Sequence, residues 1–267
     1  MNLFNLFSDI EKLDADAAGR LDFSRRKLLK NTVAAAAIAT PVLFATTVNK
    51  AFAQNNTITD VLNFALTLEY LEDEYYRTGQ LRMESLLNPV QRENIIQINK
   101  HEALHVKFLQ TALGAAAVKK PTFDFTAGGM FPTVFSNTTT FLTVALAFEE
   151  TGVRAYKGQA TNLMSNKDIL TYALQIHSVE ARHTAGIRRM LGKLVWSSES
   201  DSSFLPAAVV AGENNTIQGG VELFGLTGAG LTQGKTRPAI ETVRESFDEI
   251  LTREQVLAIA GPFIKSM

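Results

Sequence analysis

Two Glu-x-x-His motifs limit what this chain can fold into more than any other feature of the sequence. Glu102 and His105 form the first motif, and Glu180 and His183 form the second. Residues three apart on a helix lie one turn apart on the same face, so the carboxylate and the imidazole of each motif can reach one metal ion. The sequence has four histidines, and two of them end such a motif. The pattern favours helices that gather acidic and histidine side chains on their inner faces.

The first motif lies in the second of two predicted helices. Thr59 and Asp60 offer an N-cap for the first helix, and Gly79 is a typical C-terminal stop. The second helix begins after Asn88, with proline at its first position, and ends at Gly114. Because the connection between the two helices is short, we expect them to pack as an antiparallel pair.

The second motif lies in another predicted helix pair, which follows a long crossover. Residues 115–137 contain two prolines, a Gly-Gly pair and several phenylalanines, without a helical period. A third helix follows Asn137. Ser165 with Asp168 resembles a capping box that opens a fourth helix, and Gly192 ends it. The predicted fold is therefore all-α, a four-helix bundle of two helix pairs joined by a long crossover.

The two helix pairs resemble each other in sequence. Residues 64–69, FALTLE, match residues 144–149, VALAFE, and a tyrosine follows the final glutamate of each segment after seven positions, at Tyr76 and Tyr156. The second helix of each pair carries Glu-x-x-His. This repetition indicates a duplicated two-helix hairpin, in which each half contributes one glutamate from its first helix and one motif from its second.

This set of residues is typical of a metal centre. In a four-helix bundle, a glutamate from each of two helices and a Glu-x-x-His from each of the other two form a carboxylate-bridged two-metal site. Iron(II) and manganese(II) accept carboxylate oxygen and imidazole nitrogen as ligands. Two divalent ions balance the charge of four carboxylates, which would otherwise repel one another in the core. We predict two divalent ions, iron or manganese. The predicted ligands are Glu69 and Glu149 as terminal ligands, Glu102 and Glu180 as bridges, and His105 and His183, one for each ion.

Neighbouring acids compete for two of these assignments. Glu69 belongs to a run with Glu72, Asp73 and Glu74, and such runs usually lie on a solvated face. Glu72 shares a helical face with Glu69 and is an alternative ligand. Glu150 competes with Glu149 in the same way. The internal repeat favours Glu69 and Glu149, because these two positions correspond to each other.

The sequence gives weaker evidence for the roles of the two remaining histidines and the two repeated tyrosines. His101 and His177 lie beside the motifs, but the two halves do not place them equivalently, which favours a surface or supporting position over a ligand role. Tyr76 and Tyr156 lie two turns from a predicted ligand on the same face. They are either hydrogen-bond donors to the metal-site carboxylates or ordinary core residues.

Composition excludes several classes of function. The chain has 267 residues, no cysteine, a formal net charge of −1 and 46% hydrophobic residues. The absence of cysteine excludes disulfides, thiolate metal sites and thiol catalysis, and the near-neutral charge gives no indication of nucleic-acid binding. A metal ion in this protein would be held by oxygen and nitrogen.

The N-terminal segment has the order of an export signal. Residues 24–30, SRRKLLK, contain a twin arginine, residues 33–48 are apolar, and residues 51–53, AFA, form a small-residue cleavage site. We expect a twin-arginine signal peptide at residues 1–53, cleaved before Gln54, and a periplasmic or secreted protein. An uncleaved anchor or an ordinary helix is the alternative, although Pro41 interrupts the apolar run.

The remaining chain divides in two. The predicted bundle covers residues 54–196, and an irregular C-terminal extension, residues 197–267, is expected to pack on the bundle. Residues 197–237 are rich in Ser, Gly, Asn and Thr and predict mostly loop. Two short helices, Ala239–Glu249 and Arg253–Ala260, are expected near the end, before a Gly-Pro stop.

Several segments together resemble a known family. LNFALTLEYLEDEYY, HEALHVKFL, ALAFEETGVRAYKG, HSVEARH and the closing FDEILTREQVLAIAGPFI resemble the ferritin-like superfamily, and more narrowly the secreted bacterial ferritin-like domain proteins related to plant desiccation-related proteins. The resemblance runs from about residue 57 to the end. It implies a four-helix bundle with a di-iron or di-manganese site at the six predicted ligands, and each of those positions holds a residue able to bind metal. Members of the superfamily reduce or dismutate peroxide, oxidise iron or hydroxylate substrates.

Three kinds of function are compatible with these features. The first is a redox enzyme of the cell envelope that acts on peroxide or oxygen in stress protection, such as a catalase, peroxidase or ferroxidase. Without cysteine or a haem motif the chain has no partner redox centre, so peroxide disproportionation or oxidation of incoming iron fits best. The second is iron storage, which requires a homo-oligomeric cage. The third is a structural, desiccation-related protein whose metal ions only stabilise the bundle.

Overall fold

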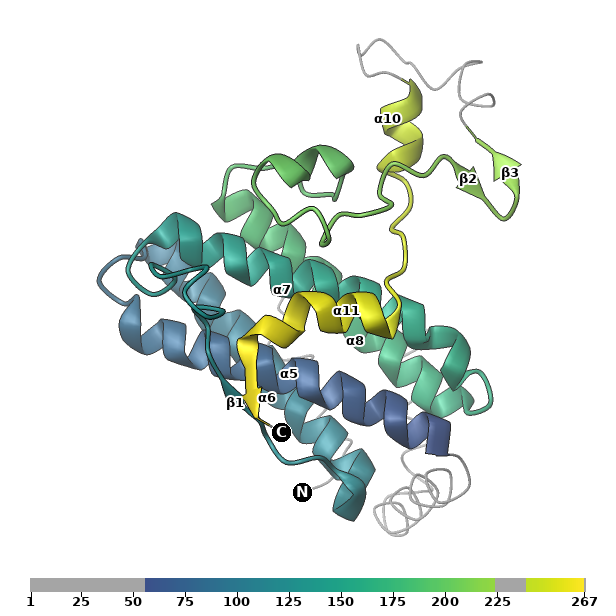
Figure 1. Cartoon of the computed structure of the whole chain (residues 1–267), viewed down its shortest axis with the longest axis horizontal. Coiled ribbons are helices and arrows are strands. Elements are labelled where there is room, and N and C mark those ends of the chain that lie inside the picture. The colour runs from purple at the N-terminus through teal and green to yellow at the C-terminus, as the bar shows by residue number, and fades with distance from the viewer. Residues whose placement is uncertain (1–55, 224–238, 267) are drawn as a thin grey trace, which may run out of the picture.

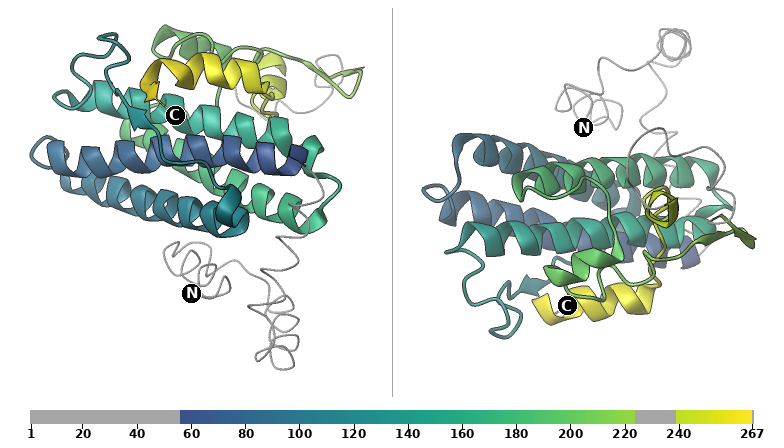
Figure 2. Two further views of the ribbon diagram at one scale, coloured as in Figure 1. Left: turned by 60° about the horizontal axis from the view of Figure 1, so that its bottom comes forward. Right: turned by 90° about the horizontal axis from the view of Figure 1, so that it is seen from above.

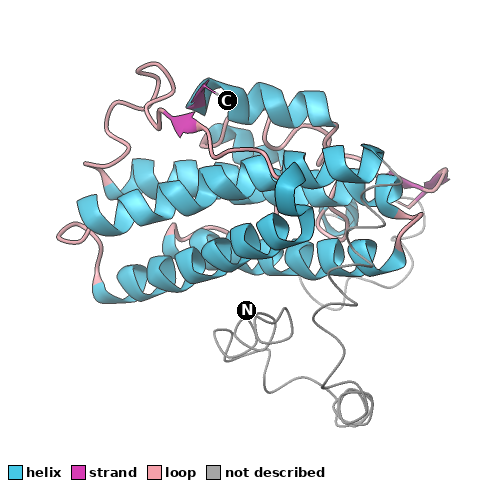
Figure 3. Cartoon of the chain, turned by 90° about the horizontal axis from the view of Figure 1, so that it is seen from below, coloured by secondary structure: helices cyan, strands magenta, loops and turns pink. Residues whose placement is uncertain are grey.

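Four long helices form the body of the protein. The computed structural model describes residues 56–223 and 239–266, and the predicted signal peptide lies outside these ranges. The predicted all-α bundle of two helix pairs is confirmed (Figures 1 and 3), with α5 packed mainly on α6, and α7 on α8. The four helices are α5 (Asn56–Arg82), α6 (Pro89–Leu113), α7 (Thr138–Gln159) and α8 (Lys167–Met190). Within the described ranges, no helix has both the length and the apolar character needed to span a membrane.

Side-chain caps determine where two of the helices begin. Asn88 accepts a hydrogen bond from the backbone N–H of Gln91, whose side chain accepts from the Asn88 N–H, so both sides of a capping box are present at α6. Asn137 accepts from the Thr140 N–H at the start of α7, with an N–O distance of 2.9 Å. These caps lie at the positions predicted from the sequence.

The predicted limits of the first helix are wrong at both ends. Thr59 and Asp60 lie inside α5 and do not cap it, because the helix extends to bury Ile58, which is 2% exposed, in the core. Gly79 does not end the helix, which runs to Arg82. Its hydrogen atom lets α7 approach closely: a Cβ added at Gly79 would meet the ring of Phe141 at 2.5 Å. This glycine serves helix packing and not chain reversal.

The predicted cap of the fourth helix is wrong by one residue. The N-cap is Asn166, which accepts a hydrogen bond from the backbone N–H of Ile169, and not Ser165. Both residue types cap well. Capping at Asn166 buries Ile169 and leaves Asp168 in the first turn, where its charge interacts favourably with the helix dipole.

The hydrophobic core follows the inner faces of the four helices. Each large apolar side chain removed from water contributes roughly 1.5–3 kcal/mol. Many of these side chains are less than 2% exposed, including Leu66, Tyr75, Ile95, Leu109 and Phe141. Tyr75 is at the centre of an aromatic group and packs against Phe125, Phe135, Phe141 and Phe148. The core therefore includes the crossover as well as the bundle.

The crossover and the C-terminus are joined to each other. After the short 3₁₀ turn η1 (Gly114–Ala116), strand β1 (Thr122–Phe123) pairs with β4 (Ile264–Ser266) in an antiparallel ladder. Phe263, from the turn η4 (Gly261–Phe263) before β4, packs edge to face on Phe148 of α7. The end of the chain thus lies on the bundle, as Figure 2 shows.

The described part of the extension, residues 197–223 and 239–266, has little regular structure of its own, and residues 224–237 of the predicted loop lie outside the described residues. It contains the turn η3 (Glu199–Ser203), the hairpin β2 (Ile217–Gln218) and β3 (Val221–Glu222), and α11 (Arg253–Ala260), which packs on α7. Another short turn, η2 (Ala160–Leu163), joins α7 to α8. Helix α10 (Ala239–Arg244) stops five residues before the predicted end at Glu249. Glu249 cannot continue the helix because its N–H donates to Glu213 and its carbonyl accepts from Arg154.

Arg154 of α7 connects the extension to the bundle. This side chain is fully buried and donates to the carbonyl oxygens of Val209, Ala211 and Glu249. Its Nε also lies 3.1 Å from the carboxylate of Glu213, which is 1% exposed. Burial raises the pKa of Glu213 to about 7, although the arginine opposes that shift. The guanidinium of Arg154 therefore donates to three carbonyl oxygens and supplies the counter-charge of Glu213.

Replacing this arginine should loosen the extension. Arg154→Met leaves the Glu213 carboxylate without its counter-charge and three carbonyls without their donor, so we expect a loss of about 3 kcal/mol or more in the free energy of unfolding by urea. The matched control is Arg77→Met, since Arg77 has a side chain 55% exposed and should change stability by less than about 0.5 kcal/mol. Equal stability of the two variants would contradict this role for Arg154.

Candidate metal centre

The six predicted ligands lie together in the middle of the bundle. Each of the four helices contributes at least one of them, and their exposures range from 0 to 4%. They fall into two overlapping groups, each with its ligand atoms within 4.8 Å of one another. The first group is Glu69, Glu102, His105 and Glu180, and the second is Glu102, Glu149, Glu180 and His183.

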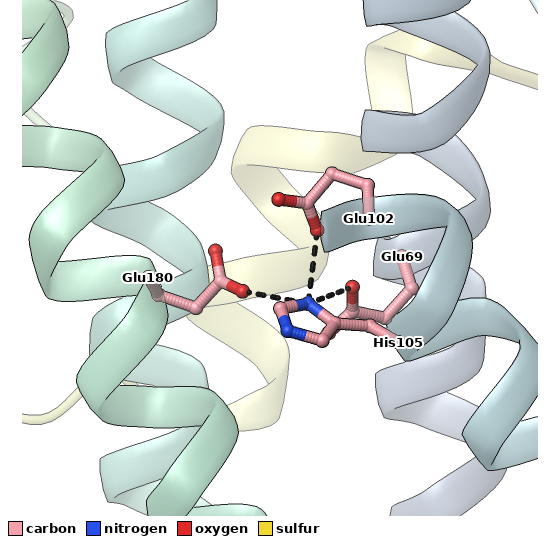
Figure 4. A group of neighbouring side chains, drawn as sticks. All are labelled: Glu69, Glu102, His105 and Glu180. Carbon is pink, nitrogen blue, oxygen red and sulfur yellow. Dashed lines mark hydrogen bonds and ion pairs between the residues drawn. The ribbon is translucent and has the colours of Figure 1, made fainter. Parts of the chain in front are cut away.

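The first group is arranged around one nitrogen atom of His105. Its Nδ1 lies 3.2 Å from Glu69 Oε2, 3.1 Å from Glu102 Oε2 and 3.1 Å from Glu180 Oε1. Figure 4 shows these three carboxylates approaching the ring from α5, α6 and α8. The i,i+3 spacing places Glu102 and His105 on one helical face, as predicted.

The second group repeats this arrangement around His183. Its Nδ1 lies 2.9 Å from Glu102 Oε1, 3.1 Å from Glu149 Oε2 and 3.7 Å from Glu180 Oε2. Glu102 and Glu180 each direct one oxygen to His105 and the other to His183. Glu69 and Glu149 each approach only one of the two histidines within ion-pair distance. The pattern is that of two shared and two terminal carboxylates.

Hydrogen bonding alone does not satisfy this arrangement. One imidazole nitrogen carries at most one proton and can donate one well-aligned hydrogen bond, whereas three carboxylate oxygens surround each Nδ1. Both oxygens of Glu180 lack a hydrogen-bond donor of suitable geometry in the described structure. Buried acceptors without a donor are costly. Two divalent cations, one near each histidine, would satisfy these oxygens and balance the four carboxylates, so the donor set fits a two-metal site.

Two buried tyrosines connect the halves of the repeat. The Tyr76 hydroxyl donates to Glu149 Oε1 and the Tyr156 hydroxyl donates to Glu69 Oε1, each over 2.5 Å. Each tyrosine therefore contacts the glutamate of the other half. A donor to one carboxylate oxygen orients that carboxylate and leaves its second oxygen for a metal ion.

The protonation of the cluster reflects burial and close charges. Burial raises the pKa of Glu69 to about 8 and that of Glu149 well above its ordinary value. For His105 and His183 burial acts to lower the pKa, but the facing glutamates outweigh it and raise the pKa of both. The same contacts lower the pKa of Glu102, against the effect of burial. Without metal, protons on these groups reduce the repulsion between the acids.

The competing acids lie outside both groups. Glu150 is held by Arg188 of α8, whose Nε donates to its carboxylate over 2.6 Å, and the same arginine pairs with Asp201. Glu72 is also buried, at 3% exposed, but forms no ion pair with either histidine of the cluster. Burial and the neighbouring glutamates raise the pKa of Glu72 well above its ordinary value. The geometry thus favours Glu69 and Glu149 over their neighbours.

His101 supports one of the two predicted histidine ligands. Its Nδ1 lies 2.8 Å from Nε2 of His183, and its Nε2 lies 2.9 Å from the side-chain nitrogen of Gln97. Burial, together with His183, lowers the pKa of His101 to about 4. The repeat gave no signal for this contact, because Val179 occupies the corresponding place before Glu180. His177 lies outside the cluster, with its Nδ1 3.0 Å from the carbonyl oxygen of Val153.

Comparison with known proteins gives one match. The family profile described as the ferritin-like domain matches residues 57–193, which cover all four helices and all six predicted ligands. No curated protein and no solved structure matches the chain significantly. The match agrees with the architecture of the bundle and with the buried Glu and His clusters.

The metal-free chain should lose stability as the pH rises from about 5 to about 8. Burial raises the pKa of Glu69 from 4.5 to about 8, so the folded state keeps a proton that the unfolded chain releases. His105 and His183 act in the same direction, because their raised pKa values stabilise the fold below the ordinary value of 6.5 and this stabilisation is lost at higher pH. We expect the melting temperature, followed by circular dichroism, to fall by about 5 °C or more over this range.

The pKa values of other groups and the effect of added metal both bear on this pH dependence. The lowered pKa values of Glu102 and Glu180 affect stability only below their ordinary value of 4.5, so they do not oppose the trend. The lowered pKa of His101 opposes it up to about pH 6.5, but Glu69, His105 and His183 together outweigh this single group. Excess manganese(II) should flatten the dependence, because cations replace the protons between the carboxylates. A melting temperature of the metal-free protein that increases between these two pH values would contradict the protonation described above.

Proposed function

This chain belongs to the ferritin-like domain family, and we propose that its bundle binds two divalent ions, iron or manganese, for redox chemistry on peroxide or oxygen. The observation that carries the proposal is the convergence of three carboxylates on each of two histidine nitrogens, with Glu102 and Glu180 shared between them. Two divalent ions would neutralise four buried acids that otherwise repel one another in the interior of the bundle.

The residues have distinct roles in this proposal. Glu69 and His105 would hold one ion, Glu149 and His183 the other, and the two shared glutamates would bridge them. Two adjacent ions of this kind supply a two-electron couple that can exchange electrons with peroxide or oxygen. The chain itself orients the carboxylates and excludes bulk water, since every one of these side chains is at most 4% exposed. Tyr76 and Tyr156 donate the hydrogen bonds that fix the two terminal carboxylates.

The absence of cysteine narrows the reaction that we propose. The sequence contains no thiol and no haem motif that could pass electrons to the bundle. Disproportionation of hydrogen peroxide to water and oxygen, and oxidation of incoming iron(II) by oxygen or peroxide, need no further reductant. We propose one of these two reactions in stress protection of the cell envelope. The envelope location follows from the predicted signal peptide, and N-terminal sequencing of the mature protein tests it through cleavage before Gln54.

A structural role is the alternative that one observation favours. All six predicted ligands are almost completely buried, which suits metal ions that hold the helices together without turnover. Such a protein would lose melting temperature on chelation but show no activity toward peroxide or oxygen. Iron storage would require a cage of many copies, and light scattering that shows a monomer or dimer would exclude it.

Metal content is the direct test of the proposal. The mature protein, purified without added metal and measured by elemental mass spectrometry, should contain two equivalents of iron or manganese. Glu102→Ala/Glu180→Ala should lose both ions, because these residues are shared. The matched control is Glu93→Ala/Asp168→Ala, which removes two exposed acids from the same two helices and should keep both ions. Failure of the unaltered protein to bind stoichiometric metal, even after reconstitution, would overturn the proposal.

The tyrosines should affect metal affinity and not only stability. Tyr156→Phe removes the donor to Glu69, and Tyr76→Phe removes the donor to Glu149, so each should weaken manganese(II) binding by about 10-fold or more. Tyr75→Phe is the control, because Tyr75 is also buried but donates to the backbone carbonyl of Phe141. Isothermal titration calorimetry should show unchanged affinity for that variant. Equal losses in all three would indicate a general packing effect.

A further inference from the structure

A fifth buried carboxylate lies beside the cluster without a partner. Glu72 is one turn beyond Glu69 on α5 and is 3% exposed. It makes no hydrogen bond or ion pair with any part of the chain that the structure describes, whereas Glu150, at similar burial, has Arg188. A buried carboxylate without a donor or a counter-charge is expensive. Its position therefore requires an explanation that packing does not give.

Glu72 lines a small cavity between three helices. The cavity has a volume of about 10 Å³, which is room for about one water molecule. Apolar side chains form most of its wall, and the polar groups on it come from Glu72 and Thr151. Thr151 donates its hydroxyl hydrogen to the carbonyl oxygen of Ala147 over 2.6 Å, which leaves a lone pair on the hydroxyl oxygen. The lining residues are Leu68, Leu71, Glu72, Phe148, Thr151, Gly152, Ile259 and Ala260.

A glycine joins this cavity to the proposed metal site. A Cβ built on Gly152 would lie 3.3 Å from Glu72 Oε1 and 3.5 Å from Glu180 Oε2. The space beside Gly152 is therefore bordered on one side by the unpartnered carboxylate and on the other by a shared carboxylate of the cluster. Any larger side chain at this position would press on both. Because residue 152 is glycine, the carboxylates of Glu72 and Glu180 border the same open space.

The outer wall of the cavity is formed by α11. Ala260 is 2% exposed and Ile259 is partly buried against the core. Figures 1 and 2 show α11 lying along α7 on the outside of the bundle, and it packs on that helix. The last turn of a short helix, and not one of the four long helices, thus separates Glu72 from the outside.

We propose that divalent metal ions reach the two-metal site between α5, α7 and α11, and that Glu72 binds each ion in transit before Glu180 receives it. The inference rests on the proposed function, because it requires that the cluster bind metal. The four central carboxylates balance two divalent ions, so the loaded site does not need the carboxyl group of Glu72, which stays available to exchange its proton for a cation. Carboxylate and hydroxyl oxygens are the ligands that hard divalent ions prefer.

The test follows the rate of metal uptake and not the activity of the loaded protein. Metal-free full-length chain is mixed with excess cobalt(II), and binding is followed by visible absorption in a stopped-flow instrument. Glu72→Gln should slow uptake by about 10-fold or more, because an amide cannot release a proton and bind the cation in its place. Glu72→Asp keeps the carboxyl group and should retain most of the rate. The final content should stay at two ions per chain in both variants.

Two further substitutions test the path itself. Gly152→Ala fills the gap between Glu72 and Glu180 and should slow uptake. Ile259→Trp places a larger side chain at the outer wall and should do the same. The matched control is Leu257→Trp on the same helix, where the side chain is 41% exposed and the rate should not change. Circular dichroism checks that each variant is folded, and Glu72→Gln carries the test alone if Gly152→Ala or Ile259→Trp is not.

The outcomes separate this inference from the proposed function. Two ions per chain with unchanged uptake rates in Glu72→Gln would overturn the path and leave the two-metal site intact. Loss of one ion in Glu72→Gln would also overturn it, because Glu72 would then be a permanent ligand. If the unaltered protein binds no cobalt(II), the proposed function fails and the path fails with it. Slow uptake with full final content supports both.

Discussion

The burial of like charges is the constraint on which the rest of this structure depends. Five glutamates, the four of the cluster and Glu72, are at most 3% exposed in the centre of one bundle. Carboxylates in a water-excluded interior repel one another and lose their hydration, so a fold that keeps them must provide positive charge or protons. In the described bundle, the two cluster histidines are the positive groups that face these acids. They cannot neutralise all of them.

The buried arginines do not neutralise the remaining central acids, because each of them pairs with an acid outside the cluster. Among the described residues, Arg154 and Arg188 are the fully buried arginines, and they pair with Glu213 and Glu150. Arg154 ties the extension to α7, and Arg188 links α7 and α8 to residue 201. The fold thus uses its buried arginines at the periphery, for tertiary structure, and neither of them pairs with an acid of the cluster. Arg154 thereby adds its hydrogen bonds to the apolar contacts that Leu205, Val209 and Val210 of the extension make with the core.

Much of the fold and of the candidate site could be predicted from the sequence, because both depend on local spacing. The Glu-x-x-His motifs, the repeated glutamate positions and the Asn caps of α6 and α7 are all short-range patterns, and the structure brings these residues to the places that the patterns predicted. The cap of α8 was wrong by one residue, and the pattern left open whether the two tyrosines donate to the carboxylates of the site. The other features that were missed depend on contacts between distant segments. Gly79 looked like a helix stop but accommodates Phe141, and Glu72 looked like part of a solvated acidic run but faces a cavity whose outer wall is formed by α11. His101 had no counterpart in the repeat, and nothing near Arg154 in the sequence points to residues 209–213.

The reciprocal contacts of the two tyrosines have a consequence for the origin of this chain. Tyr76 holds Glu149 and Tyr156 holds Glu69, so neither hairpin completes its own carboxylate. A free two-helix hairpin with the ancestral pattern would form the same contact twice across a two-fold axis, as a symmetric homodimer. Gene fusion would then have turned an interface between subunits into the interior of one subunit. After fusion the two copies would no longer have to stay identical. His101 corresponds to Val179 in the other half, so His183 has a histidine neighbour that His105 lacks.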